Sequence, residues 1–89
     1  MSIVVTRLEF ECVAASIRNM STVDKEIMLA SSGVDPDVAE FIYRRLLETR
    51  MIYVRATGHQ YTYFTEMGKI NLNHPSGVAD MLNLVNESD

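Results

Sequence analysis

The sequence has little cysteine, proline or glycine and no long apolar run. A single thiol, Cys12, cannot form an internal disulfide, and this favours a reducing compartment. No stretch approaches the roughly 18–20 apolar residues that span a bilayer. The first residues lack a basic region, an apolar core and a cleavage site, so no signal peptide is expected. We therefore expect a cytoplasmic protein without a membrane span.

Motifs for catalysis or cofactor binding are also missing. The chain has no glycine-rich phosphate loop, and no serine, histidine and acid converge on one motif. Cys12, His59 and His74 lack the spacing of metal ligands and lie on three different predicted elements. We expect no metal, no cofactor and no enzymatic activity.

Size and charge narrow the class of protein further. The 89 residues fit one domain, 1–89, and the net charge is −4. The charge is uneven, because residues 41–74 carry five basic and two acidic residues, whereas the rest carries three basic and ten acidic ones. A local basic patch on an acidic body still binds phosphate, since screening limits the repulsion to about 10 Å.

Two helices are predicted in the first third of the chain. Thr6 and Glu9 have the spacing of a capping box, which predicts a helix over about 7–19. A short second helix follows the weaker cap signals of Ser21 and Asp24, and it ends at Gly33 in the left-handed position. Its predicted buried stripe is Val23, Ile27 and Ala30. Val34 then closes a tight turn between helices.

A third helix is predicted to begin at Asp35-Pro36, an N-cap residue followed by proline at the first helical position, and to run to about Arg50. Its predicted core stripe is Val38, Ile42 and Leu46. The residues predicted to point outward are Pro36, Asp37, Glu40, Tyr43, Arg44 and Leu47.

Two strand-like runs, 51–56 and 61–65, flank the loop TGHQ and predict a β-hairpin. One face would carry Ile52, Val54, Thr62 and Phe64, and the other Tyr53, Arg55, Tyr61 and Tyr63. The tyrosines are able to stack on bases or anchor a protein partner. The interpretation favoured here is that they pack against the segment 3–5 or the last helix.

The remaining residues predict a helical stretch from Glu66, a break at His74-Pro75, and a final helix within 75–87 capped by Ser76. One face of this last helix is apolar and is predicted to form a homodimer interface. That face consists of Val78, Met81, Leu82 and Val85.

Residues 26–70 resemble the winged helix–turn–helix regulators, including the MarR-like group. Met51-Ile52 matches the apolar pair that opens the first wing strand, and the run from Phe64 to Lys69 matches the motif that closes the second. Arg50 stands where the family often has glycine, the turn from Gly33 to Val38 is one residue shorter, and the wing lacks an arginine-rich tip. The resemblance implies a three-helix core with a wing and an extra C-terminal helix.

The resemblance also implies a function. A transcriptional regulator would place helix 35–50 in the major groove of double-stranded DNA and wing 51–65 on the backbone. The residues expected to contact DNA are Asp37, Glu40, Tyr43, Arg44, Arg55, His59 and Lys69. The alternative is a protein–protein interaction module of the same fold that modulates a larger complex without binding DNA. The acidic total charge and the short wing favour this alternative.

Overall fold

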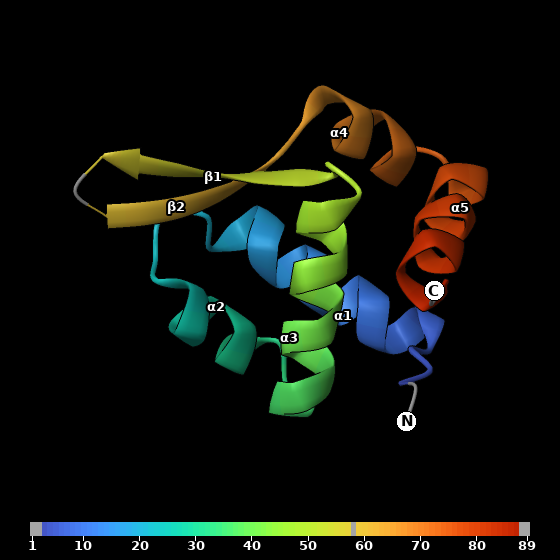
Figure 1. Ribbon diagram of the computed structural model, residues 1–89, viewed down its shortest axis with the longest axis horizontal. Helices are drawn as coiled ribbons and strands as arrows, with labels where there is room; N and C mark the ends of the chain where they lie inside the picture. Colours follow the sequence, from blue (N-terminus) through green and yellow to red (C-terminus); the bar gives the residue numbers. More distant parts are fainter. Residues whose placement is uncertain (1–2, 58, 88–89) are drawn as a thin grey trace.

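The computed structural model describes residues 3–57 and 59–87, and within them the chain forms five helices and one antiparallel hairpin (Figure 1). The helices are α1 (Arg7–Asn19), α2 (Lys25–Ser31), α3 (Pro36–Glu48), α4 (Glu66–Leu72) and α5 (Pro75–Asn86), and the strands are β1 (Ile52–Thr57) and β2 (His59–Phe64). The hairpin extends from one end of the molecule, and α5 lies at the other. One apolar core joins α1, α3, α5 and the inner face of the hairpin.

The predicted first helix is confirmed at both ends. The backbone amide of Glu9 donates to Oγ1 of Thr6, and the amide of Thr6 donates to Oε1 of Glu9, which completes the capping box. The buried face of α1 is the predicted one, with Phe10 and Ile17 almost fully enclosed.

The buried stripe predicted for the second helix is wrong. Met28 and Leu29 are buried in α2, whereas the side chain of Ile27 is 56% exposed and Ala30 lies on the surface. A helix of only seven residues gives too short a pattern to fix its rotation, and packing against α1 and α3 decides it. The predicted glycine turn is confirmed, because Gly33 has φ 73°.

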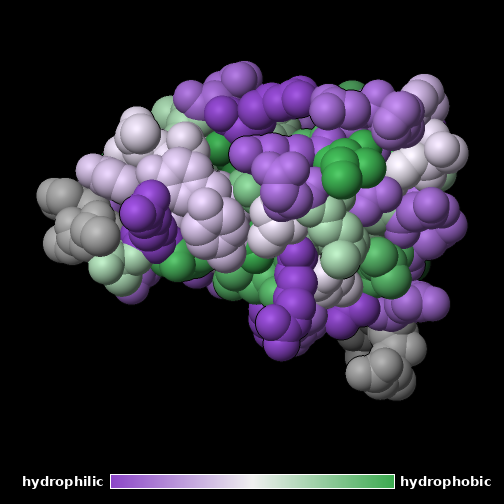
Figure 2. All heavy atoms as spheres, turned by 90° about the horizontal axis from the view of Figure 1, so that it is seen from above, coloured by the Kyte–Doolittle hydropathy of each residue, from purple (hydrophilic) through white to green (hydrophobic). Residues whose placement is uncertain are grey.

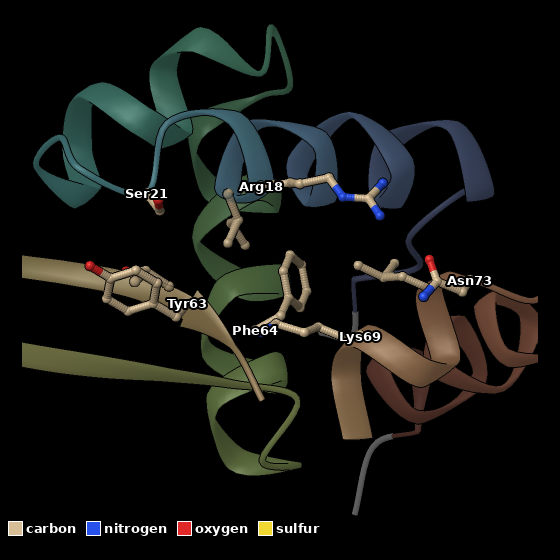
Figure 3. Close-up of a pocket in the computed structure, with 9 residues that line it drawn as sticks. Arg18, Ser21, Tyr63, Phe64, Lys69 and Asn73 are labelled. Atoms are coloured by element: carbon tan, nitrogen blue, oxygen red, sulfur yellow. The ribbon is translucent and has the colours of Figure 1, made fainter. Parts of the chain in front are cut away.

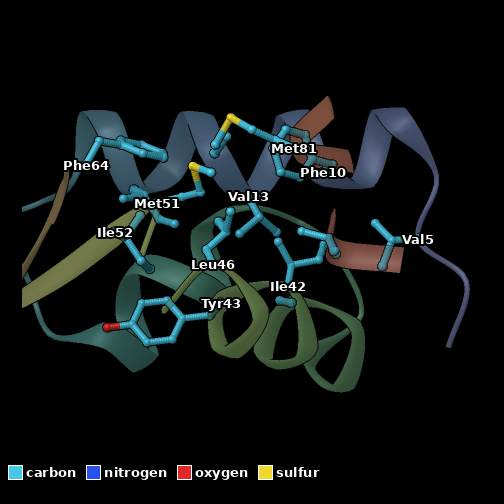
Figure 4. Close-up of a cluster of buried hydrophobic side chains, with 14 of the residues drawn as sticks. Val5, Phe10, Val13, Ile42, Tyr43, Leu46, Met51, Ile52, Phe64 and Met81 are labelled. Atoms are coloured by element: carbon cyan, nitrogen blue, oxygen red, sulfur yellow. The ribbon is translucent and has the colours of Figure 1, made fainter. Parts of the chain in front are cut away.

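Helix α3 begins as predicted, with the carboxylate of Asp35 accepting from the amide of Asp37 and Pro36 in the first position. Ile42 and Leu46 are fully buried, as predicted, and point into the core (Figure 4). The outward placement of Tyr43 is wrong. Its side chain is 4% exposed because the hairpin covers that side of the helix, and its hydroxyl lies 2.8 Å from Oγ1 of Thr62.

The hairpin has the predicted two faces. Its register pairs Ile52 with Phe64 and Val54 with Thr62 on one face, and Tyr53 with Tyr63 and Arg55 with Tyr61 on the other. The predicted loop of four residues is too long, because strand pairing continues to Thr57 opposite His59. The inner face carries the buried residues, and the tyrosine face is the outer one. The favoured packing of that face on segment 3–5 or the last helix is also wrong, since this segment and α5 both lie at the other end of the molecule from the hairpin (Figure 1).

A strained backbone position joins α3 to β1. Arg50 has φ 61°, the left-handed region that glycine occupies at no steric cost. Oγ1 of Thr65 donates to the carbonyl of Arg50 over 2.8 Å, which helps to hold this conformation.

We expect Arg50→Gly to raise the melting temperature by roughly 2–6 °C, because relief of the left-handed strain outweighs the added freedom of the unfolded chain. The control is Arg50→Ala, which removes the same charge but keeps the strain. Calorimetry of both variants checks this. A glycine variant that melts no higher than the alanine variant would contradict it.

The C-terminal helix begins two residues earlier than the predicted Ser76 cap implies, at Pro75. His74 occupies the N-cap position of α5 without a side-chain cap, and Ser76 lies in the first turn, so the predicted Ser76 cap is wrong. Pro75 explains the shift, since a residue without an amide hydrogen suits the first helical position.

The apolar stripe of α5 packs on the chain's own core. Val78, Met81 and Val85 are buried, and Leu82 is half-buried against the same cluster. The guanidinium of Arg45 donates to the carbonyl of Leu84 over 2.8 Å, which fastens α5 to α3. These side chains are therefore not a free surface, and the homodimer prediction loses the feature on which it rested.

None of the helices in the described part of the chain is long and apolar enough to cross a membrane.

Candidate nucleic-acid interface

The outward side of α3 is the first part of the predicted interface. Arg44 and Asp37 are exposed there, and Arg44 has no ion-pair partner within residues 3–57 and 59–87. Glu48 is exposed on the same side and accepts from Arg45 at 2.8 Å. Arg44 is thus the one cation on this side whose charge is not already neutralised by a carboxylate.

Two other predicted residues on α3 interact with other parts of the protein. Oε1 of Glu40 lies 3.0 Å from Nζ of Lys25, an ion pair that links α2 to α3. The same ammonium lies 5.3 Å from the ring centre of Tyr43, which is buried under the hairpin. Tyr43 therefore supports the fold and presents no hydroxyl to a ligand. Glu40 offers only a partly neutralised carboxylate.

The outer face of the hairpin carries the predicted wing residue. Arg55 is exposed and has no ion-pair partner in the described part of the chain. It shares its face with Tyr53 and Tyr63, and this face is the one turned away from Thr62 and α3. The side chain of His59, the other predicted residue of the hairpin, lies outside the described residues.

Lys69 lies on α4, beside the hairpin and not on it. Its ammonium is exposed and sits 3.8 Å from Glu66, a pair so open to water that it contributes little. The predicted residues therefore form two groups. Arg44 and Asp37 lie on α3, whereas Arg55 lies on the outer face of the hairpin and Lys69 lies on α4 beside the hairpin.

A cleft that the sequence did not predict lies between the end of α1, the strand β2 and α4 (Figure 3). Its volume is about 290 Å³. The apolar lining comes from Ile17, Phe64 and Leu72, and the polar lining from Arg18, Ser21, Thr62, Tyr63, Lys69 and Asn73. Arg18 is exposed and, within the described residues, has no ion-pair partner.

The charge around this cleft is more positive than the net charge of the whole protein suggests. The sequence between Glu48 and Glu66, which contains the whole hairpin, has no acidic residue and includes Arg50 and Arg55. In Figure 2 the hairpin, at the left, shows weakly hydrophilic side chains beside strongly hydrophilic ones. The hairpin is thus a local exception on an acidic protein, and its field favours an anion.

No group of three or more His, Cys, Asp or Glu side chains in the described residues is arranged to hold a metal ion. Cys12 is a half-buried free thiol on α1. The search against family models, the search of curated proteins and the search of solved structures each found no match.

Proposed function

We propose that this protein is a small winged-helix regulator that binds double-stranded DNA. In this proposal α3 enters the major groove and the hairpin contacts the flanking backbone. The order of elements carries the proposal. A short helix, a tight glycine turn and a longer helix lead directly into a hairpin. Exposed arginines that have no ion-pair partner among the described residues lie on both α3 and the hairpin.

The proposed contacts follow from which side chains are free. Arg44 reaches from α3 and is suited to a guanine edge or to a phosphate. Arg55 reaches from the hairpin and is suited to a phosphate, because it lies on the wing that would contact the DNA backbone. The exposed carboxylate of Asp37 would repel DNA phosphates, so the favourable approach of DNA is to the half of α3 nearer Arg44. The net charge of −4 keeps non-specific affinity low, so the interaction is strongest at low salt.

Two single substitutions test the proposed contacts. Arg55→Ala is expected to weaken duplex binding equally for all sequences and to flatten the salt dependence by about one unit of slope. If Arg44 contacts a base, Arg44→Ala costs about 1–3 kcal/mol and relaxes preference at one position. Fluorescence anisotropy with labelled duplexes measures both effects.

The matched control is Arg7→Ala. Arg7 is an exposed arginine in the first turn of α1, paired with Glu11 at 3.7 Å. The start of α1 lies far from the hairpin (Figure 1). This substitution is expected to leave duplex affinity unchanged. Equal losses in all three variants would mean that only the total charge matters, which contradicts the proposed surface.

A second candidate function is a protein-interaction module on the same fold. The observation that favours it is the exposed side of α3, which carries three carboxylates. They belong to Asp37 and to Glu40 and Glu48, of which the last two are paired with Lys25 and Arg45. A basic partner surface would match these carboxylates. The absence of any duplex affinity at low ionic strength, in a folded protein, would favour this function over DNA binding.

A further inference from the structure

The outer face of the hairpin holds two tyrosines side by side. Tyr53 and Tyr63 are directly opposite in the strand register, with ring centres 5.6 Å apart and planes tilted by 30°. The side chain of Tyr53 is 44% exposed, and Tyr63 lies half-buried where the hairpin meets the cleft. Two adjacent rings on a sheet surface make a platform on which other flat rings are able to stack.

Cations lie on both sides of this tyrosine platform. Arg55 is on the same face of the hairpin, two residues after Tyr53. Arg18 and Lys69 line the cleft that Tyr63 also lines (Figure 3). The closest carboxylate to any of these three cations among the described residues is Glu66, which is 3.8 Å from Lys69 and highly exposed.

We infer that the tyrosine platform and the cleft beside it bind single-stranded nucleic acid. Unpaired bases stack on Tyr53 and Tyr63, and phosphates lie along Arg55, Arg18 and Lys69. A duplex does not fit this chemistry, because its bases are covered by their neighbours and offer no free ring face. The cleft volume of about 290 Å³ is just below the usual range of small-molecule sites, so the cleft has room for no more than a small group such as one base.

This inference goes beyond the proposed duplex binding and does not depend on it. Duplex recognition uses the outward side of α3 with Arg44, whereas the single strand uses Tyr53, Tyr63 and Arg18. Arg55 is shared, and Lys69 is both an expected duplex contact and a residue of the cleft. Substitution of Arg44 therefore separates the two activities, since it should weaken duplex binding and leave single-strand binding unchanged.

Tyrosine fluorescence reports stacking directly. The protein has four tyrosines and no tryptophan, so its intrinsic emission comes from tyrosine alone. We expect oligothymidylate of about twelve residues to quench this emission and to bind with a salt slope of about −2, as about three phosphate contacts would give. An abasic strand of the same length is the control, because it keeps the phosphates and lacks the rings. It should bind far more weakly and cause little quenching.

Variants of Tyr53 separate stacking from charge. Tyr53→Leu should weaken oligothymidylate binding by roughly 5- to 100-fold, whereas Tyr53→Phe, which keeps the ring, should bind nearly as the parent does. Circular dichroism checks that both variants are folded. Arg18→Ala should reduce the salt slope by about 0.7, and Arg7→Ala should not change it.

DNA and RNA share the stacking and phosphate chemistry, so oligouridylate is tested in parallel with oligothymidylate. Whichever of the two binds more tightly identifies the kind of nucleic acid that the site prefers. The inference is overturned if neither strand binds the folded protein at low salt. It is also overturned if the abasic strand binds as tightly as oligothymidylate, or if Tyr53→Leu binds as well as Tyr53→Phe.

Discussion

Replacing Leu46 by alanine is expected to lower the free energy of unfolding by about 2–5 kcal/mol. Leu46 is fully buried on α3, where its side chain points toward Val13 of α1 (Figure 4). Truncation removes apolar contacts and leaves a cavity between the two helices. A domain of this size has a total stability of only about 5–15 kcal/mol, so the loss would be a large share of it.

Urea denaturation followed by circular dichroism measures this loss. The control is Leu47→Ala at the next position, where the side chain is half-buried and less contact is lost. The midpoint should fall much further for Leu46→Ala than for Leu47→Ala. Equal midpoints would mean that the core side of α3 has been assigned wrongly.

Replacing Gly68 by alanine is expected to destabilise the protein by about 1–3 kcal/mol or more. A Cβ at this position would lie 2.2 Å from the carbonyl oxygen of Met51. That oxygen is held in place by the amide of Thr65 at 2.9 Å, so it has little freedom to move away. The close approach of α4 to the start of β1 requires a residue without a side chain.

The sign of this effect is informative, because alanine normally stabilises a helix over glycine by about 0.5–1 kcal/mol. Gly33→Ala is the companion variant. Apart from its neighbours in the chain, Gly33 has no atom of the described residues within 4 Å of where a Cβ would lie, but its φ is 73°. The stability that Gly33→Ala loses therefore reports backbone strain alone. Thermal melts compare the two. A Gly68→Ala protein that melts at or above the temperature of the parent would contradict the expected clash between a Cβ at this position and the carbonyl oxygen of Met51.

Local capping signals made parts of the fold predictable from the sequence. The starts of α1 and α3 follow from Thr6 with Glu9 and from Asp35-Pro36, since these caps act within three residues along the chain. The alternation of residue types along the two strands also predicted the two faces of the hairpin, because a strand places successive side chains on opposite sides.

Features that depend on tertiary contacts were not predictable. The rotation of α2 is set by α1 and α3, and Tyr43 is buried only because the hairpin folds over it. The cleft could not be found from the sequence, since Arg18 on α1 is far along the chain from Tyr63 and Lys69, which lie on the neighbouring elements β2 and α4. Arg18 was visible as a cation near the end of α1, but nothing local connects it to the hairpin.

The stripe on α5 shows a different kind of ambiguity. Apolar residues at helical spacing indicate that one side of a helix is buried, but they do not say whether the chain itself or a second copy covers it. Here Met81 and Val85 complete the core beside α1 and α3. An 89-residue chain has few apolar residues to spare, and this last helix is used to close its own core.

An NMR titration of the ¹⁵N-labelled protein with duplex DNA at low salt tests the proposed function most directly. The proposal predicts that the amide signals that move will cluster on the outward side of α3, around Arg44, and on the hairpin, around Arg55. Amides at the start of α1 and along the buried side of α5 should remain unchanged. The absence of shifts on α3 at saturating duplex would contradict the claim that this helix reads DNA.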